Sequence, residues 1–590
     1  QTTTDIGFNA EDPTSCILRK NVLGVIPCRI KNITKSVLEE FTFSPQASQF
    51  LETNKQTVQI FESMPETNGA YETLVNGANL HVNILTSTQE TKNIPHGLFP
   101  LVVAQTTSGT SIHSEDAVTT FLEYGTIGAI KGQLLSVTID DANASTQGAT
   151  DSEIEPRKVV AADYIAGQYP SVIKSILSTN DIQNIKTNLE YDLRFGKPTS
   201  TKDASNIESL VSYDNFGRPT VTESTTGTRL EQETVFCSDQ IVGCSEQYAE
   251  NAVYKTSQKV YKVEDGLIES ETHSYTDAFG RNLANVSLNM NGIHIIATKE
   301  YDERGRLVKE SAPFCNSAGC DGPKYTQYTY SDIENTKSII LPDGSSSVIT
   351  TEHDIAGISK TTRVAGLKYK DVDQVEQTRS QKKVSYANSL GLTTRVEDWK
   401  NSSDFINTEF RYDALDRLIY TKVNNSEIAV SASDSETLIA YDNVKNIKAI
   451  LEPNTGLSIS KMNVLGELVL ETQKGLDITN GTDKQTRYQY DKLGRLINKL
   501  DVTEGKADQW FYDRYPIDTD GVWAYTNSNC TLGQLCEVSA NGGLYRERYS
   551  YIQADKDGEG NVRQINTLLK HSAQTSLRNY NSQISYDKFG

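Results

Sequence analysis

The stretch Tyr490-Asp-Lys-Leu-Gly-Arg-Leu496 decides the fold, because its pattern returns along the chain. Clear copies are Tyr213-Asp-Asn-Phe-Gly-Arg-Pro, Tyr275-Thr-Asp-Ala-Phe-Gly-Arg, Tyr301-Asp-Glu-Arg-Gly-Arg-Leu, Tyr412-Asp-Ala-Leu-Asp-Arg-Leu and Tyr441-Asp-Asn-Val-Lys-Asn-Ile, and Tyr586-Asp-Lys-Phe-Gly590 starts another. Looser copies begin at Tyr191, His353, Tyr386 and Met462. The closest neighbours are 21 to 33 residues apart, a period typical of repeat architectures.

Each copy has the chemistry of a hairpin turn. The aspartate can accept a hydrogen bond from a nearby backbone N–H, and the glycine three residues later tolerates the positive φ that closes such a loop. The flanking sequence is rich in β-forming residues, as in Leu418-Ile-Tyr-Thr-Lys-Val423. We therefore predict antiparallel hairpins whose tyrosines lie side by side as an aromatic ladder across the strands.

The residues expected to form these turns share one structural, non-catalytic role. They are Tyr213, Asp214, Gly217, Arg218, Tyr275, Gly280, Arg281, Tyr301, Asp302, Gly305, Arg306, Tyr412, Asp413, Arg417, Tyr441, Asp442, Tyr490, Asp491, Gly494 and Arg495. We expect the arginines to reach neighbouring aspartates, with a small gain in stability if the pairs are exposed. The tyrosine rows could also bind sugars by ring stacking, although packing within the repeat is the simpler interpretation.

Composition favours a thin wall over a thick core. The chain has 590 residues, and its hydrophobic share is 37% with tyrosine included. Counting glycine in place of tyrosine gives about 38%, below the ~45–50% usual for globular chains. The net charge of −20 argues against a nucleic-acid partner. The longest apolar stretch, Gly97 to Ala104, is interrupted by Pro100, so we expect no membrane-spanning segment.

Eight cysteines fall into four local pairs, each flanking turn-rich sequence. The candidate disulfides join Cys16 with Cys28, Cys237 with Cys244, Cys315 with Cys320, and Cys530 with Cys536. Local bridges of this kind form in oxidising compartments, which favours a secreted or cell-surface protein. Reduced thiols and metal ligation remain alternatives, although the spacings and the scattered histidines suit a zinc site poorly.

The repeated Tyr-Asp-x-x-Gly-Arg-Leu resembles the YD repeat of the RHS (rearrangement hotspot) family over about residues 186–590. The segments Gln509–Asp513 and Gly533–Tyr545 also resemble sequence between the repeats of very large RHS proteins. The resemblance implies an all-β fold in which a long antiparallel ribbon of hairpins winds into a hollow shell or part of one. In bacterial toxins of this family, including insecticidal toxin complexes and polymorphic toxins, the shell encloses a C-terminal toxic domain. Teneurins use a related barrel in cell adhesion.

The family pattern continues with a core region that holds an aspartyl self-cleavage site. No Asp-Pro-x-Gly core motif is present, and the sole Asp-Pro is Asp12-Pro13. Cleavage residues are therefore not carried over, and we expect the C-terminal core and the toxin to be absent from this chain. The start at Gln1 rather than Met suggests a processed or excised segment.

Residues 1–185 lack clear copies and form a separate strand-rich region, either early shell ribbon or a plug at one end. A helix is expected near Pro170–Leu177 with Ser171 as its cap. Two acidic turns, Asp555–Gly560 and Asp518–Gly521, are weak calcium candidates beside the interpretation as ordinary turns.

No catalytic signature or phosphate-binding loop is present, so we expect no enzyme and no cofactor. The many Asp and Glu residues leave a carboxylate pair for glycoside hydrolysis open, but the sequence selects no particular pair. The hypothesis is a structural shell segment that encapsulates and delivers a toxin segment of the full-length chain. The alternative is a teneurin-like adhesion module that binds surface glycans.

Overall fold

The computed structural model is an all-β ribbon, which confirms the predicted fold class. It describes residues 2–5, 30–44, 49–63, 84–93, 100–108, 118–126, 128–141, 156–177, 184–225, 227–237, 244, 250–262, 266, 268–289, 292–315, 320–331, 333, 335–355, 357–370, 372, 375–413, 416–425, 436–442, 447–463, 465–475, 483–516, 530, 532–552, 560–570 and 577–585. In these ranges 39 strands form one sheet, with two short 3₁₀ turns, Gly128–Ile130 and Asn541–Gly543.

The strands in the first half of the chain are β1 (Thr2–Asp5), β2 (Ile30–Ser44), β3 (Gln49–Ser63), β4 (Ile84–Asn93), β5 (Pro100–Ser108), β6 (Val118–Tyr124), β7 (Leu134–Asp141), β8 (Arg157–Ile165), β9 (Tyr169–Ile176), β10 (Ile185–Asp192), β11 (Lys197–Lys202), β12 (Glu208–Tyr213), β13 (Pro219–Ser224), β14 (Thr228–Phe236), β15 (Tyr254–Lys262), β16 (Ile268–Thr276), β17 (Asn282–Leu288), β18 (His294–Tyr301), β19 (Leu307–Ser311) and β20 (Phe314–Cys315).

The remaining strands are β21 (Tyr325–Ser331), β22 (Thr336–Ile340), β23 (Ser346–His353), β24 (Ser359–Lys370), β25 (Glu376–Ala387), β26 (Thr393–Trp399), β27 (Phe405–Tyr412), β28 (Leu418–Asn425), β29 (Glu436–Asp442), β30 (Ile447–Glu452), β31 (Gly456–Met462), β32 (Leu468–Gly475), β33 (Lys484–Tyr490), β34 (Leu496–Asp501), β35 (Lys506–Tyr512), β36 (Leu535–Ala540), β37 (Tyr545–Tyr551), β38 (Val562–Lys570) and β39 (Leu577–Gln583).

Pairing follows chain order. Each described strand is antiparallel to its neighbours in sequence, apart from a local split at which β18 pairs with both β19 and β20 and β19 then pairs with β21. β9 pairs with β10, so the ribbon is continuous across residue 185. The fold is thus one long meander.

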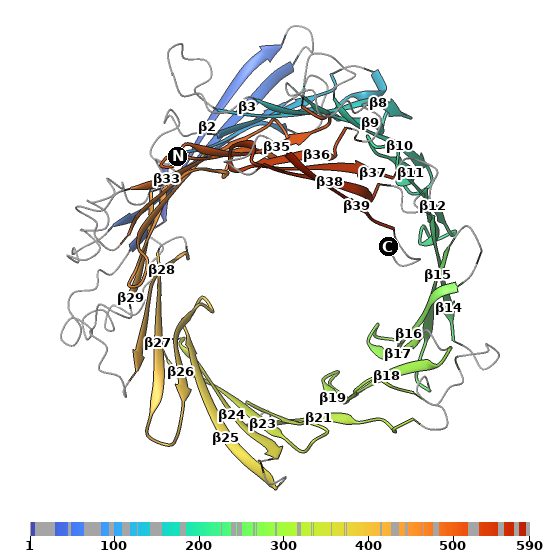
Figure 1. Ribbon diagram of the computed structural model, residues 1–590, viewed down its shortest axis with the longest axis vertical. Coiled ribbons are helices and arrows are strands. Elements are labelled where there is room, and N and C mark those ends of the chain that lie inside the picture. The colour runs from blue at the N-terminus through green and yellow to red at the C-terminus, as the bar shows by residue number, and fades with distance from the viewer. Residues whose placement is uncertain are drawn as a thin grey trace.

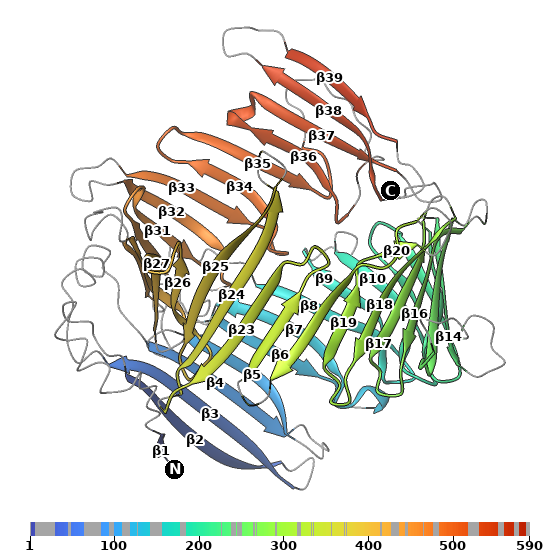
Figure 2. The ribbon, with the colours of Figure 1, turned by 90° about the horizontal axis from the view of Figure 1, so that it is seen from below.

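The ribbon winds into a ring around an open centre (Figure 1). It passes from β2 and β3 at the top, clockwise through β14–β18 and β21–β25, and returns to the top as β35–β39. Figure 2 shows β36–β39 displaced along the ring axis from β6–β9, so the winding is a spiral. We call β2–β30 the first coil and β31–β39, which return past the start, the second coil.

The apolar interior is divided into small local clusters, as a wall of one sheet requires. One unites Ala440, Ala449 and Leu457, and another surrounds Tyr275 with Ala284, Val286 and Ile296. Most other strand positions with described burial are half-buried. The low apolar share of the sequence has this physical basis.

The helix expected at Pro170–Leu177 is wrong, because this segment is β9. Val172 and Ile173 pair with Ala162 and Ala161 of β8 on one side and with β10 on the other. β-branched side chains suit such a strand, and pairing on both edges outweighs the local capping signal. Ser171, the expected cap, donates through its hydroxyl to the carbonyl of Asp163.

Candidate functional site

The repeated turn is the chemical unit from which the wall is built. In the copy that starts at Asp214, the Oδ1 atom accepts from the backbone N–H of Phe216 and of Arg218, and Arg218 Nε donates to Oδ2. The same aspartate–arginine pair recurs with Nε–Oδ2 distances of 2.6–2.8 Å at Asp277/Arg281, Asp302/Arg306, Asp413/Arg417 and Asp491/Arg495. One carboxylate therefore closes the turn and holds the arginine.

Hydrogen bonds to the charged carboxylate lower its pKa. The backbone N–H of Arg218 is the main cause of the lowered pKa of Asp214, and that of Arg306 has the same effect on the pKa of Asp302. Both carboxylates are thus held ionised.

Glycine stands where the turn needs positive φ. Gly217, Gly280, Gly305 and Gly494 have φ between 73° and 81°. Asp416 occupies the equivalent place in the Tyr412 copy with φ of 63°, and its N–H donates to the carbonyl of Asp413 as the glycines do in other copies.

Consecutive copies are joined through the tyrosine hydroxyl. Each tyrosine ends a strand and donates to a carbonyl at the start of an earlier strand, immediately after the preceding turn. These bonds are Tyr213 to Pro198 (2.6 Å), Tyr301 to Asn282 (2.9 Å), Tyr412 to Thr393 (2.8 Å), Tyr441 to Leu418 (3.2 Å) and Tyr490 to Leu468 (3.0 Å).

Two of these tyrosines, Tyr301 and Tyr441, also receive an arginine from the preceding turn. The guanidinium carbon of Arg281 lies 4.9 Å from the ring centroid of Tyr301, and that of Arg417 lies 4.1 Å from Tyr441. Arg306 and Arg495 lie over Tyr330 and Tyr512 in the same way. At these places an ion pair joins the aspartate to its arginine, and a cation–π contact joins the arginine to the next tyrosine. We call this series of contacts the relay.

This relay corrects the predicted aromatic ladder. Among the described ring pairs, only Tyr169 and Tyr191 are two stacked tyrosines. At four places an arginine covers the tyrosine ring instead. The predicted aspartate–arginine pairs differ in their exposure. The side chains of Arg417 and Asp413 are 27% and 2% exposed, whereas Arg218 is 46% exposed.

Tyr275 does not have the role predicted for it. The extra residue Thr276 stands directly before the turn aspartate, Asp277, and the register shift falls between Tyr275 and Thr276. Successive side chains on a strand point to opposite faces, so Thr276 takes the tyrosine place. Tyr275 instead lies in the cluster with Ala284 and Val286, 2% exposed.

The last copies are only partly described. Tyr441 makes both contacts above, and Asp442 lies at the end of β29, paired in register with Ile447. Residues 443–446 of this turn, and the copy at Tyr586, lie outside the described residues.

A second set of tyrosines, which the repeat pattern did not predict, donates hydrogen bonds to glutamates. Tyr328 donates to a carboxylate oxygen of Glu310, and Tyr488 to one of Glu471. Burial, with a further contribution from the carboxylate, raises the pKa of both tyrosines to about 12. The available signal was Tyr-x-Tyr, as in Tyr328-Thr-Tyr330 and Tyr488-Gln-Tyr490, in which the second tyrosine makes the carbonyl bond.

Three of the four candidate cysteine pairs form disulfide bonds, namely Cys237–Cys244, Cys315–Cys320 and Cys530–Cys536. The Cys530–Cys536 bridge is buried against Tyr515 and Tyr551. The fourth pair is not confirmed, because Cys16 and Cys28 both lie outside the described residues. A bridge between Cys16 and Cys28 therefore stays a prediction from the sequence.

The described part of the chain lacks the marks of a metal site and of a membrane-spanning helix. It contains no group of three or more His, Cys, Asp or Glu side chains arranged to hold a metal ion, and no helix there could cross a membrane. Most of the two acidic turns considered for calcium, Asp555–Gly560 and Asp518–Gly521, lies outside these ranges.

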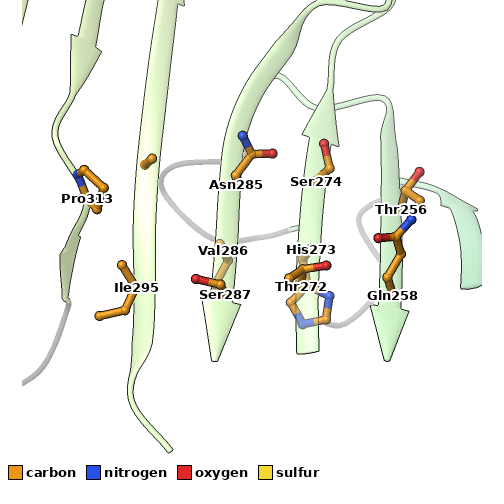
Figure 3. A pocket seen from close by; sticks show the side chains of 11 residues that line it. Thr256, Gln258, Thr272, His273, Ser274, Asn285, Val286, Ser287, Ile295 and Pro313 are labelled. Atoms are coloured by element: carbon orange, nitrogen blue, oxygen red, sulfur yellow. The ribbon is translucent and has the colours of Figure 1, made fainter. Parts of the chain in front are cut away.

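A groove with mixed polar and apolar lining crosses β15–β18 (Figure 3). Directly paired residues place Thr256, Ser274 and Asn285 on one face, and Gln258, Thr272 and Ser287 continue that face beside Ile295 and Pro313. Its lining offers hydroxyl and amide groups, the imidazole of His273 and several apolar side chains, and no Trp, Tyr or Phe ring and no carboxylate belongs to it. This chemistry suits hydrogen bonding and lacks a broad stacking surface for sugars.

No protein-family model matches the chain, and no curated protein matches it either. Among solved structures, the chain is similar to the crystal structure of TcdB2-TccC3, with 11% identity and a TM-score of 0.33 over 95% of this chain and 36% of the other. Similar too are TcdB2-TccC3-Cdc42 (10% identity, TM-score 0.27, 95% and 43% covered) and the Photorhabdus luminescens Tc holotoxin pore (10%, 0.27, 95% and 41%). The chain thus spans less than half of these chains, and at such TM-scores the fold assignment rests on its own sheet.

Proposed function

We propose that the chain is a structural segment of an RHS-type shell, which encloses a toxic polypeptide encoded in the same full-length protein and delivers it. The observation that carries the proposal is the spiral of one continuous sheet around an open centre (Figures 1 and 2). The wall would act by containment, keeping an unfolded or active segment away from solvent and from targets in the producing cell.

The direction of the ribbon supports this role. β39 is the last described strand, and it lies on the inner side of the ring in Figure 1. β1 and β39 lie at opposite ends of the spiral along the ring axis in Figure 2. A polypeptide that continues from β39 would therefore start on the inner side of the wall.

The turn chemistry supports a structural rather than a catalytic role. In five turns the ionisable groups are committed to pairing, since the aspartate holds an arginine of its own turn. The three disulfides support a location outside the reducing cytosol, in a secreted or surface-exposed shell.

Protease protection of a passenger tests containment. The full chain would carry an unstructured peptide with a site for a sequence-specific protease after Gly590, and the matched control would carry the same peptide before Gln1. We expect cleavage of the peptide after Gly590 to be slower by about tenfold or more, because it is reachable only through opening of the wall. Equal cleavage rates at the two ends, in a folded chain, would contradict containment.

The adhesion alternative predicts selective binding of the intact chain to a glycan array. The groove of Figure 3 gives it little support, because sugars are commonly held against Trp, Tyr or Phe rings and this lining has none. Selective glycan binding together with an unprotected passenger would favour adhesion over containment.

A further inference from the structure

The two coils of the spiral meet at an ion pair between residues far apart in sequence. Arg157 begins β8 in the first coil, and its Nη2 atom donates to both carboxylate oxygens of Glu467 in the second coil, at 2.7 and 2.8 Å. The two residues are 310 positions apart. Their side chains are 22% and 14% exposed, so the contact is shielded from most of the solvent that weakens surface ion pairs.

Arg157 also contacts the next turn of the second coil. Its Nη2 atom lies 3.4 Å from the carbonyl oxygen of Asp491. A Cβ at Gly494 would lie 2.8 Å from Arg157 Nη1 and 2.9 Å from Glu467 Oε1. The guanidinium therefore fits between two consecutive turns, and glycine leaves room for it.

The turn that receives Arg157 departs from the repeat in its charge. Asn463 stands in the place that Asp491 has in the next copy, and Glu467 stands in the place of Arg495. Asn463 Oδ1 still accepts from the N–H of Leu465 and of Glu467, and its amide donates to Glu467 Oε2 at 2.8 Å. The turn keeps its shape while a negative group replaces the positive one.

Two further contacts between the coils carry no charge. Ser205 Oγ donates to the carbonyl of Leu532 at 3.3 Å, and Ile207 Cδ1 lies 2.5 Å from the position that a Cβ on Gly560 would take. Such contacts hold the coils together but distinguish poorly between one repeat and the next. We call the contact between the coils at Arg157, Glu467 and Gly494 the seam. The charges at the seam can distinguish one repeat from the next.

We infer that Arg157 and Glu467 form a register key, which selects the turn of the second coil that docks on β8 and so sets the circumference of the shell. A slip by one copy would bring Arg495 to Arg157, and two cations replacing an ion pair would disfavour that register. Since each copy adds two strands at ~4.8 Å each, one slip would change the circumference by about 10 Å. The inference concerns closure of the wall and does not depend on what the shell encloses.

Charge reversal in the isolated full chain tests the key. The variants are R157E, E467R and the double variant R157E/E467R, and the control is K158E. Lys158 is adjacent to Arg157, but it pairs within the first coil with Glu123, at 38% and 62% exposed. Small-angle scattering would report the dimensions, limited proteolysis would report access to the seam, and circular dichroism would verify that the strands are formed.

We expect each single reversal to enlarge the particle and to speed cleavage near the seam about tenfold, because two like charges then face each other across it. The double variant should return to within about twofold of the unmodified chain, since the pair is restored with opposite polarity. K158E should change neither measurement. Single variants that keep the original dimensions and cleavage rate, or a folded double variant that stays open, would overturn the register key.

A pair of glycine variants provides a second test that leaves all charges in place. Gly466 and Gly494 have φ of 80° and 79°, so alanine strains both turns alike. A Cβ at Gly466 meets no atom within 4 Å, whereas at Gly494 it would displace Arg157. Opening of the seam in G494A but not in G466A would support the key, and equal effects would overturn it. Because these measurements use no passenger, protection of a passenger can fail independently of them.

Discussion

Arg417 lies between two partners that belong to different repeats. Its guanidinium binds Asp413 in its own turn, with an Nε–Oδ2 distance of 2.7 Å, and covers the ring of Tyr441 at 4.1 Å. The tyrosine in turn donates to the carbonyl of Leu418, directly after Arg417. The link between these two repeats therefore consists of one ion pair, one cation–π contact and one hydrogen bond.

Replacing Arg417 with alanine should remove two of these interactions. We expect the free energy of unfolding to fall by about 2 kcal/mol, because the half-buried ion pair and the cation–π contact are both lost. Arg218→Ala is the matched control, since Arg218 is 46% exposed and covers the exposed Phe216 of its own turn; its cost should stay below about 1 kcal/mol. Denaturant unfolding compares the two variants, and equal losses in the free energy of unfolding would contradict a stabilising link between the repeats.

The tyrosine hydroxyl is tested by removing one oxygen atom. Tyr412→Phe should lower the free energy of unfolding by about 1 kcal/mol, since the carbonyl of Thr393 loses its donor. Tyr580→Phe, on a side chain that is 49% exposed, should have little effect. A neutral Tyr412→Phe would show that the hydroxyl contributes nothing to stability.

Asp416 offers a stabilising substitution. It holds φ of 63° at a place where other copies have glycine, and a side chain in this left-handed region costs roughly 1 kcal/mol. Asp416→Gly should therefore raise the melting temperature, although glycine's greater freedom in the unfolded chain offsets part of the gain. The reverse change, Gly466→Asp, should lower it, and a lower melting temperature for Asp416→Gly would contradict this account.

High pH should weaken the wall at its tyrosines. The pKa of Tyr328 and Tyr488 is about 12 in the folded chain, above the unfolded value of about 10. The folded state thus favours the protonated ring, so its stabilisation is complete below about pH 10 and is lost as the pH rises toward 12. Ultraviolet absorbance of tyrosinate should show delayed ionisation, and Glu471→Gln should bring the titration of Tyr488 to lower pH. A titration of Tyr488 unaffected by this change would contradict the role of the carboxylate.

Reduction should destabilise the end of the second coil. The Cys530–Cys536 bridge has a sequence separation of 6, and a loop of this size contributes about 2 kcal/mol through the unfolded state. A Cys530→Ser/Cys536→Ser variant should melt earlier than the oxidised chain and should no longer respond to reductant at this site. Proteolysis between 513 and 551 would report the change locally.

The repeat in the sequence predicted the hairpins well because a turn depends on a few adjacent residues. Asp491, Gly494 and Arg495 are close in sequence and close in space, so their geometry could be anticipated. Tyr275 was misjudged by one position, since an inserted residue moves a side chain to the other face of a strand. β9 was mistaken for a helix because its pairing with β8 and β10 outweighs a local signal.

The contacts between coils could not be predicted from the sequence. The departure at Asn463 and Glu467 is visible there, but nothing local identifies Arg157, 310 residues earlier, as its partner. That pairing depends on how many strands complete one coil, which in turn depends on the twist and bend summed over the whole ribbon.

Pairing largely in chain order has a consequence for assembly. Apart from β20 and β21, which pair with β18 and β19, each new described strand needs only the edge left by the strand before it. The ribbon can therefore grow from its N-terminal end as the polypeptide emerges from the ribosome. The ion pair between Arg157 and Glu467 cannot form at that stage. Glu467 is synthesised 310 residues after Arg157, when β8 is already paired. The order of synthesis would thus set the order of folding: the first coil forms first, and the second coil docks on it afterwards.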